Sequence, residues 1–307
     1  MALPAGVRLH HPEGSDEDAV AVLVLTTACQ VADTGRSDRE LADVIEDWGR
    51  PGADLARDAW IAEDGSGETI GYAYVAPPDA EVRVHPRARG RGLGSHLREL
   101  VEARAAERGA GELHQRVAVG IRIAERPLEL AGYVPVWSTW RLERPLDVAP
   151  EPPSWPSGVT AAMLDDERGV AEVLALLERS ETAGPDGEPL ALDRFHAEHL
   201  ADERLDAGLC VLACRRDRTV GVAICESWND ADGIVVQLAV DRGERFEPVG
   251  RALLLEAFAQ MRERGIETVV VPVGAPGAGN DAELPEPYAS VGLRPVWQQA
   301  TWRKRLG

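Results

Sequence analysis

The chain carries one sequence pattern twice, and this repeat limits its fold more than any other feature. Residues 131–145 read AGYVPVWSTWRLERP, and residues 291–306 read VGLRPVWQQATWRKRL. Each begins around a glycine, continues into an apolar segment with Trp137 or Trp297 five residues later, and then reaches Thr-Trp-Arg. Two such closing segments, at the middle and at the end of 307 residues, predict two copies of one domain.

The correspondence continues upstream of the closing segments. ETIGYAYVAPP at 68–78 matches RTVGVAICESW at 218–228. The segment between the copies is rich in proline, which favours an extended spacer. The sequence therefore predicts a first domain at 1–146, a linker at 147–157 and a second domain at 158–307.

Within each copy, apolar segments of strand length alternate with amphipathic segments of helical length. Leu97, Leu100, Val101 and Ala105 recur at a spacing of three or four, which is typical of a helix, and Gly109 is expected to end it. The pattern predicts an α/β fold in which a mixed central sheet is flanked by helices. Predicted strands lie at 7–10, 59–63, 69–75, 80–84, 112–119, 159–163, 210–215, 219–227 and 234–240, and predicted helices at 16–27, 38–48, 165–180 and 192–201.

Composition narrows the class of partner. The net charge of −19 would repel the phosphates of nucleic acid. No apolar run is long enough to span a bilayer, and the N-terminus lacks the order of a signal peptide. We expect a cytoplasmic monomer or homodimer that binds neither nucleic acid nor membrane. Four scattered cysteines lack the clustered ligands of a metal site, so we expect buried free thiols and no metal at Cys29, Cys210, Cys214 and Cys225.

The most distinctive short motif is RARGRGLGSH at 87–96, between a predicted strand and a predicted helix. Its glycines let backbone N–H groups approach a ligand, and the first N–H groups of a helix lack internal partners. Together these features predict an anion site whose usual occupant is phosphate, with Arg89 and Arg91 adding charge-assisted contacts. The alternative is a tight turn that binds nothing. The motif contains neither Gly-Lys-Ser/Thr nor Gly-x-Gly-x-x-Gly, so the nucleotide-binding fingerprints fit poorly.

This stretch resembles the acetyl-coenzyme A (acetyl-CoA) signature of the GNAT superfamily of N-acetyltransferases, Arg/Gln-x-x-Gly-x-Gly/Ala. Gly132-Tyr133 is similar to the Gly-Phe that precedes the last strand in that family, and the tandem length resembles the mycothiol synthase arrangement. The resemblance implies two tandem GNAT-like domains. It also implies that the loop amides hold the pyrophosphate of acetyl-CoA, the co-substrate, and that the preceding strand bonds the pantetheine through its backbone. The implied cofactor-binding residues are Val82, Arg83, Val84, Arg89, Gly90, Arg91, Gly92, Leu93, Gly94 and Ser95.

The second copy has changed at this motif. Phe246, Glu247 and Pro248 stand where the first copy has Gly-Arg-Gly. Phe246 is bulky, Glu247 would repel a phosphate, and Pro248 has no N–H to donate. We therefore expect the second copy to have lost donor binding. The family often carries a tyrosine four residues before its Gly-Phe; the second copy has Tyr288 there, expected to be a packed aromatic, and the first copy has Leu128.

The candidate catalytic residues of the first copy are Glu81 and His114. A thioester is attacked by a neutral amine, so a base or a water chain must take a proton. Glu81, on the strand before the loop, is either such a base or the salt-bridge partner of Arg83, and His114 lies on the next strand. Backbone polarisation and positioning leave open a reaction without any catalytic side chain. Trp48 and Trp60 are candidates for lining an acceptor pocket.

The sequence thus predicts an N-acetyltransferase that moves an acetyl group from acetyl-CoA to the amine of a small molecule, with the donor in the first copy. The alternative is a catalytically weak acyl-CoA-binding sensor. A mycothiol synthase proper would need a working loop in the second copy, against which Glu247 and Pro248 argue.

Overall fold

The structure, a computed structural model, describes residues 3–37, 39–164, 167–180, 190–200, 206–216, 218–227, 231–276 and 287–306. Its contacts group into two compact units. The first runs to Val136 and takes in the chain from Gln299 onward, and the second begins at Trp137 and includes residues up to Gln298.

The first unit contains a sheet in the order β1-β2-β3-β4-β5, followed by the last residues of β12. Strands β4 and β5 pair in parallel and the other pairs are antiparallel. Its elements are β1 (Arg8–His10), α1 (Asp16–Thr34), α2 (Leu41–Trp48), α3 (Leu55–Asp58), β2 (Ala59–Glu63), β3 (Thr69–Ala76), β4 (Asp79–Val84), α4 (Leu93–Glu107), β5 (Glu112–Ala118) and α5 (Arg122–Leu130).

The second unit contains a sheet in the order β6-β11-β10-β9-β8-β7, in which only β10 and β11 pair in parallel. Its elements are β6 (Val134–Pro145), β7 (Val159–Met163), α6 (Glu167–Ser180), α7 (Leu192–Phe195), β8 (Val211–Arg215), β9 (Arg218–Ser227), β10 (Asp232–Val240), α8 (Phe246–Glu263), β11 (Thr268–Pro276) and β12 (Arg294–Arg305). The predicted helix at 192–201 is therefore shorter: α7 ends at Phe195, and a π-helical turn follows at His196–Leu200.

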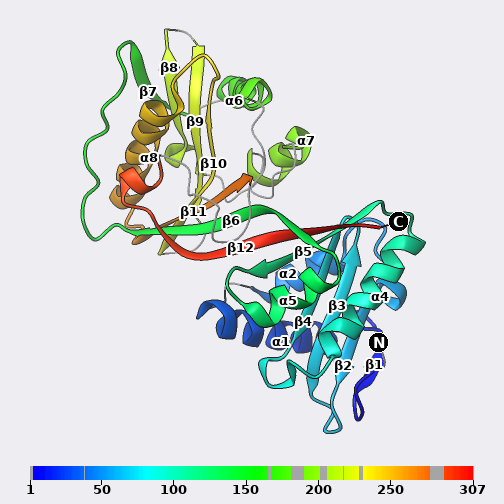
Figure 1. Cartoon of the computed structure of the whole chain (residues 1–307). Helices are drawn as coiled ribbons and strands as arrows, with labels where there is room; N and C mark the ends of the chain where they lie inside the picture. Colours follow the sequence, from blue (N-terminus) through cyan, green and yellow to red (C-terminus); the bar gives the residue numbers. More distant parts are fainter. Residues whose placement is uncertain are drawn as a thin grey trace. The chain divides into compact units, whose positions relative to one another are not determined.

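In the first unit, α1 and α2 cover one face of the sheet and α4 covers the other (Figure 1). The period-2 alternation of the strands builds a core on each face. Tyr72 and Tyr74 of β3 pack under α1 and α2, whereas Ala73 and Val75 pack under α4. Ser15 caps α1 by accepting a hydrogen bond from the N–H of Asp18, and the helix continues to Thr34, past the predicted end at residue 27. Both faces of the sheet are thus covered, as the predicted α/β fold requires.

The closing strand of each repeat is exchanged between the units. Trp137–Pro145 of β6 pairs with β11, inside the second unit. Gln299–Arg305 of β12 pairs with β5, inside the first unit. The predicted division at 1–146 and 158–307 follows the sequence repeat, whereas the compact units follow these two strands. Sequence similarity does not reveal with which sheet a closing strand pairs.

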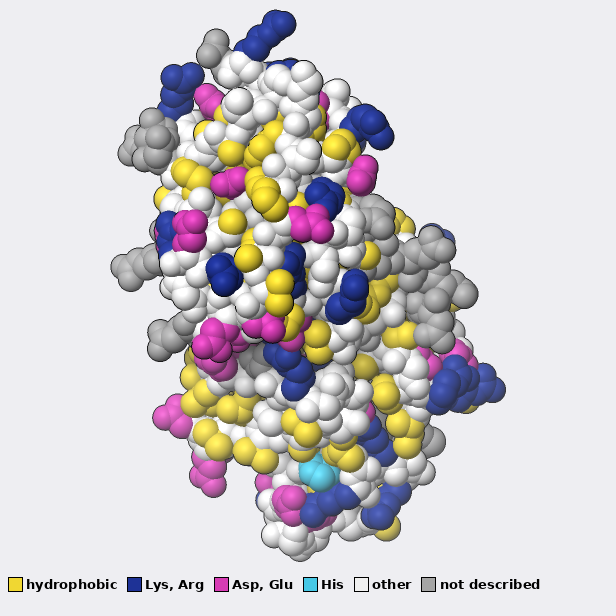
Figure 2. Space-filling model, turned by 90° about the vertical axis from the view of Figure 1, so that its left-hand side faces the viewer, with side chains coloured by type: hydrophobic (Ala, Val, Ile, Leu, Met, Phe, Trp, Pro, Cys, Tyr) yellow, Lys and Arg dark blue, Asp and Glu magenta, His cyan; other side chains and the backbone are white. Residues whose placement is uncertain are grey.

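The cysteines and the tryptophans of the closing strands lie mostly in the interior, and charged side chains lie on the surface. All four cysteines are free; Cys214 is only partly buried and the others are buried. Trp140 and Trp302, on the closing strands β6 and β12, are buried in hydrophobic clusters. Figure 2 shows acidic and basic side chains interspersed with hydrophobic ones over one face. No helix in the described ranges is long and apolar enough to cross a bilayer.

Candidate active site

The first unit opens a gap between β4 and β5. The two strands pair only at Asp79 and Ala80, beyond which their ladder ends. The N–H of His85 donates to the carbonyl of Ile70 on β3, so odd-numbered residues of β4 turn their backbone groups toward β3. The backbone groups of Val82 and Val84 consequently face the gap. Two strands that part in this way leave peptide groups for a ligand to bond.

The loop between β4 and α4 brings bare backbone to the same end of the gap. Gly90 and Gly92 have φ of +76° and +91°, values that disfavour residues with a Cβ. Within the described chain, no acceptor bonds the backbone N–H groups of residues 90–95. Because α4 begins at Leu93, its positive dipole end adds to these donors. The arrangement suits an anion.

A cavity of about 290 Å³ joins the gap to the loop. It is lined by most of the predicted donor residues, namely Val82, Arg83, Val84, Arg89, Gly90, Gly92, Gly94 and Ser95. Arg91 is exposed and does not line the cavity. The side chain of Leu93, the first residue of α4, is buried between that helix and the sheet. Arg83 also differs from expectation, because its backbone faces Tyr72 of β3 and only its side chain reaches the cavity.

Arg89 is engaged within the protein. Its guanidinium makes two contacts to the carboxylate of Asp33 on α1, at 2.5 and 3.0 Å, and its Nε donates to the carbonyl of Val84 at 3.0 Å. The thiol of Cys29 donates to the same carbonyl at 3.3 Å, and burial raises its pKa. These contacts fix α1 against the end of β4 and leave Cys29 a protonated thiol rather than a nucleophilic thiolate.

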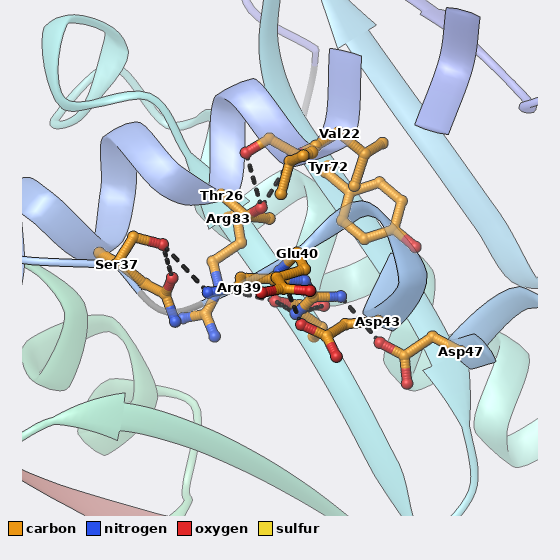
Figure 3. A network of polar contacts seen from close by, with 12 residues as sticks. Val22, Thr26, Ser37, Arg39, Glu40, Asp43, Asp47, Tyr72 and Arg83 are labelled. Carbon is orange, nitrogen blue, oxygen red and sulfur yellow. Dashed lines mark hydrogen bonds and ion pairs between the residues drawn. The ribbon is translucent and has the colours of Figure 1, made fainter. Parts of the chain in front are cut away.

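Glu81 forms ion pairs rather than standing free as a base. Its carboxylate accepts from Arg39 at 3.2 and 3.3 Å and from Nε of Arg83 at 2.8 Å, and Arg39 continues to Asp47 at 2.7 Å (Figure 3). Burial would raise the pKa of Glu81, but Arg83 and Arg39 together hold it below the usual value. A carboxylate held ionised by two cations is a weak proton acceptor. The structure thus favours the salt bridge over the base.

The other predicted side chains lie away from the cavity. His114 is buried on the face of β5 opposite Gln115 and lies 3.2 Å from Glu112. Trp48 donates to the hydroxyl of Tyr72 in the core below α1 and α2, and Trp60 packs below α4. None of these three predicted side chains lines the cavity. The sequence assigned these residues to the correct strands and helices, but it did not show that their side chains point away from the cavity.

A buried polar network on the α4 side was not anticipated. Gln115, which lines the cavity, donates to the hydroxyl of Tyr133 at 2.9 Å. Lys304, the only lysine in the chain, lies 5.6 Å from the centre of that ring and donates to Glu102 at 2.7 Å. Lys304 arrives on the exchanged β12, so only the strand exchange brings it here. In the sequence, the feature that could have indicated this network is that Lys304 is the single lysine of the chain.

The second unit repeats the gap but not the loop. Strands β10 and β11 part after Ile234 and border a cavity of about 280 Å³ that Phe246 and Tyr288 also line. In the loop after β10, the carboxylate of Asp241 accepts from the N–H of Gly243 at 2.9 Å and from two arginines. Tyr288 belongs to the hydrophobic core, as predicted, and burial raises its pKa.

Each unit has a parallel strand pair that parts and leads to a helix, and in the first unit the loop before that helix presents free backbone N–H groups within the described chain. This arrangement is that of a tandem acyltransferase of the coenzyme A-dependent type. The acetyltransferase (GNAT) family matches residues 25–127 and 171–280. The chain therefore belongs to the GNAT acetyltransferase family, and the predicted tandem arrangement is confirmed.

Relatives and solved structures agree with this assignment. A protein from Thermobispora bispora called mycothiol acetyltransferase is 30% identical over 83% of this chain and 87% of its own length. One of the same name from Saccharopolyspora erythraea is 26% identical over 70% and 77%. A GCN5-related N-acetyltransferase structure from Sphaerobacter thermophilus superposes with a TM-score of 0.84 at 27% identity, covering 99% and 97% of the two chains. A tandem GNAT protein from the clavulanic acid pathway shares the fold, with a TM-score of 0.67 at 16% identity over 98% and 99%.

Proposed function

We propose that the first unit binds acetyl-CoA and transfers its acetyl group to the amine of a small molecule. The observation that carries this proposal is the row of unpaired N–H groups at residues 90–95 beside open space: a Cβ added at Gly90 would meet nothing within 4 Å. The residues present fit a pyrophosphate at this loop and an amide-bearing arm along Val82 and Val84. The donor supplies an activated thioester carbonyl.

The protein's own contribution is positioning and polarisation. The backbone N–H groups of Val82 and Val84 face the gap and are directed at the region where carbonyl charge develops. The described residues that line the cavity include no carboxylate or imidazole free of an ion pair, since Asp33 is bound by Arg89. The proton of the amine therefore leaves to water, and holding the amine against the thioester supplies the rate.

The same observation supports a second candidate, an acyl-CoA-binding protein with little turnover. Leu128 lies at the cavity where the family often has a tyrosine, so a side-chain acid for the leaving thiolate is missing at that position. Binding would be unaffected by this change, whereas transfer would be slowed. The two candidates therefore separate by turnover and not by affinity.

Calorimetry with acetyl-CoA followed by a thiol-release assay tests both. We expect one binding site per chain, because the first turn of α8 carries Glu247, which would repel a phosphate, and Pro248, which has no N–H to donate. The thiol-release assay uses a panel of small-molecule amines, and one of them is the acceptor of the mycothiol acetyltransferases. Turnover of any amine supports the transferase, and tight binding without turnover supports the sensor. Two equal sites per chain, or no binding, would refute the donor site itself.

A further inference from the structure

Arg83 has hydrogen-bond donors that the protein leaves unused. Only its Nε is engaged, with Glu81, and the structure gives its two Nη groups no partner in the described part of the chain. Arg89 is fully engaged by Asp33 and Val84, and Arg98 contacts Glu102 and the carbonyl of Pro127. Arg83 is therefore the cavity cation with the most unused donors.

The side chain of Arg83 lies on the opposite side of β4 from the loop that would hold the donor phosphates. Side chains of a strand alternate, and Val84 points toward α4, where its Cγ2 lies 3.4 Å from a Cβ added at Gly94. Arg83 instead points to the α1 side, where Cys29 and Asp33 complete the wall. An anion bound there would lie across β4 from the donor's phosphates, so it would belong to the other substrate, the acceptor.

The ion pairs around Arg83 fix the position of its side chain, but no carboxylate in the described chain pairs with Arg83 alone. Glu81 is shared between Arg83 and Arg39, and Asp47 is shared between Arg39 and Arg50, so three guanidinium groups surround two carboxylates. The Arg83 side chain is 25% exposed, and the contact with Glu81 uses its Nε edge. The remaining edge, with both Nη groups, matches the two oxygens of a carboxylate.

We propose that Arg83 selects acceptors that carry a carboxylate, binding it through both Nη groups while the amine of the same molecule faces the thioester. This proposal rests on the proposed transferase function of the first unit. It names an acceptor class, an amine that also bears a carboxylate, such as an amino acid or a small peptide. Arg83 is then a specificity residue that contacts the acceptor and leaves donor binding unaffected.

The test compares matched acceptors, amino acids and dipeptides against the same molecules as C-terminal carboxamides. With the full chain and acetyl-CoA, we expect kcat/KM at least 10-fold higher for the acids. Arg83→Gln should lower kcat/KM at least 30-fold for the acids and less than 3-fold for the carboxamides, with the KM for acetyl-CoA within 2-fold. Arg83→Lys should recover part of the preference, because charge remains but the paired geometry is lost.

Arg87→Gln is the matched control, since Arg87 is exposed in the short 3-10 turn after β4 and pairs with Asp64 and Glu68 away from the cavity. It should change none of these values. Equal rates on acids and carboxamides, a preference that survives Arg83→Gln, or a rise of the acetyl-CoA KM above 10-fold in that variant would each overturn the proposal.

A binding experiment distinguishes failure of the proposed transferase function from failure of the proposed carboxylate site. If no amine is acetylated, binding of benzoate and benzamide to the acetyl-CoA-loaded protein is measured by NMR. Binding of benzoate that benzamide does not share and that Arg83→Gln abolishes would retain the carboxylate site. Equal binding of both probes, or none, would reject it.

Discussion

The sharpest prediction concerns two glycines of the first unit with nearly the same backbone conformation. Gly90 in the loop has φ of +76°, and Gly109 after α4 has φ of +74°; a Cβ added to either meets no atom within 4 Å. An alanine at φ near +75° is strained by about 1–2 kcal/mol. Gly90→Ala and Gly109→Ala should therefore lower the free energy of unfolding, measured with urea, by the same amount.

Their effects on donor binding should differ sharply. Gly90 lines the cavity, so the methyl group at residue 90 occupies space that the donor's phosphates would use. Losing one charge-assisted hydrogen bond costs about 1.5–3 kcal/mol, which corresponds to a rise of about 10- to 150-fold in Kd for acetyl-CoA. Gly109→Ala should leave Kd within 2-fold. Calorimetry decides: an unchanged Kd in Gly90→Ala, or equal weakening in both variants, would refute the bare-backbone site.

Three further predictions address what supports the site. Lys304→Met should lower the free energy of unfolding by about 1–3 kcal/mol in urea titrations, because the carboxylate of Glu102 on α4 loses one donor. The control Arg305→Met, at an exposed residue, should change this free energy little. Glu81→Gln should cost about 3 kcal/mol at pH 7. Because the folded pKa of Glu81 lies below its usual 4.5, that stabilisation is complete above pH 4.5 and disappears as the pH falls through the folded value, so the two proteins should converge in acid unfolding; a constant difference would contradict the ion pair. A fragment of residues 1–146 should fail to fold by circular dichroism and size exclusion, because it lacks the strand that pairs with β5; a folded monomer that binds acetyl-CoA would show the exchange to be dispensable.

Local pattern predicted much of the fold and of the donor loop. The alternation in β2 and β3, the helical spacing from Leu97 and the glycines around Arg89 are all encoded within short windows. The structure places each of these close to the predicted position, with α4 beginning at Leu93. Such features depend on neighbours in sequence, and sequence contains them directly.

What sequence could not supply were contacts between distant segments. The exchange of β6 and β12 leaves the repeat unchanged, because both closing strands retain the same Val-Trp and Thr-Trp-Arg pattern whichever sheet they join. The ion pair of Arg89 with Asp33 spans 56 residues, and the contact of Lys304 with Glu102 spans 202. The role of Glu81 was open for the same reason, since Arg39 approaches it only in the folded chain.

The two gaps of the chain share their strands and differ in the loop that follows them. Both units splay a parallel strand pair and border cavities of similar volume, about 290 and 280 Å³. They differ where the gap meets the following helix: within the described residues, the first unit leaves the N–H groups of residues 90–95 without an acceptor, and the second places Glu247 and Pro248 in the first turn of α8. Glu247 would repel a phosphate and Pro248 has no N–H to donate, so we predict that the loops, and not the strands, restrict donor binding to the first unit.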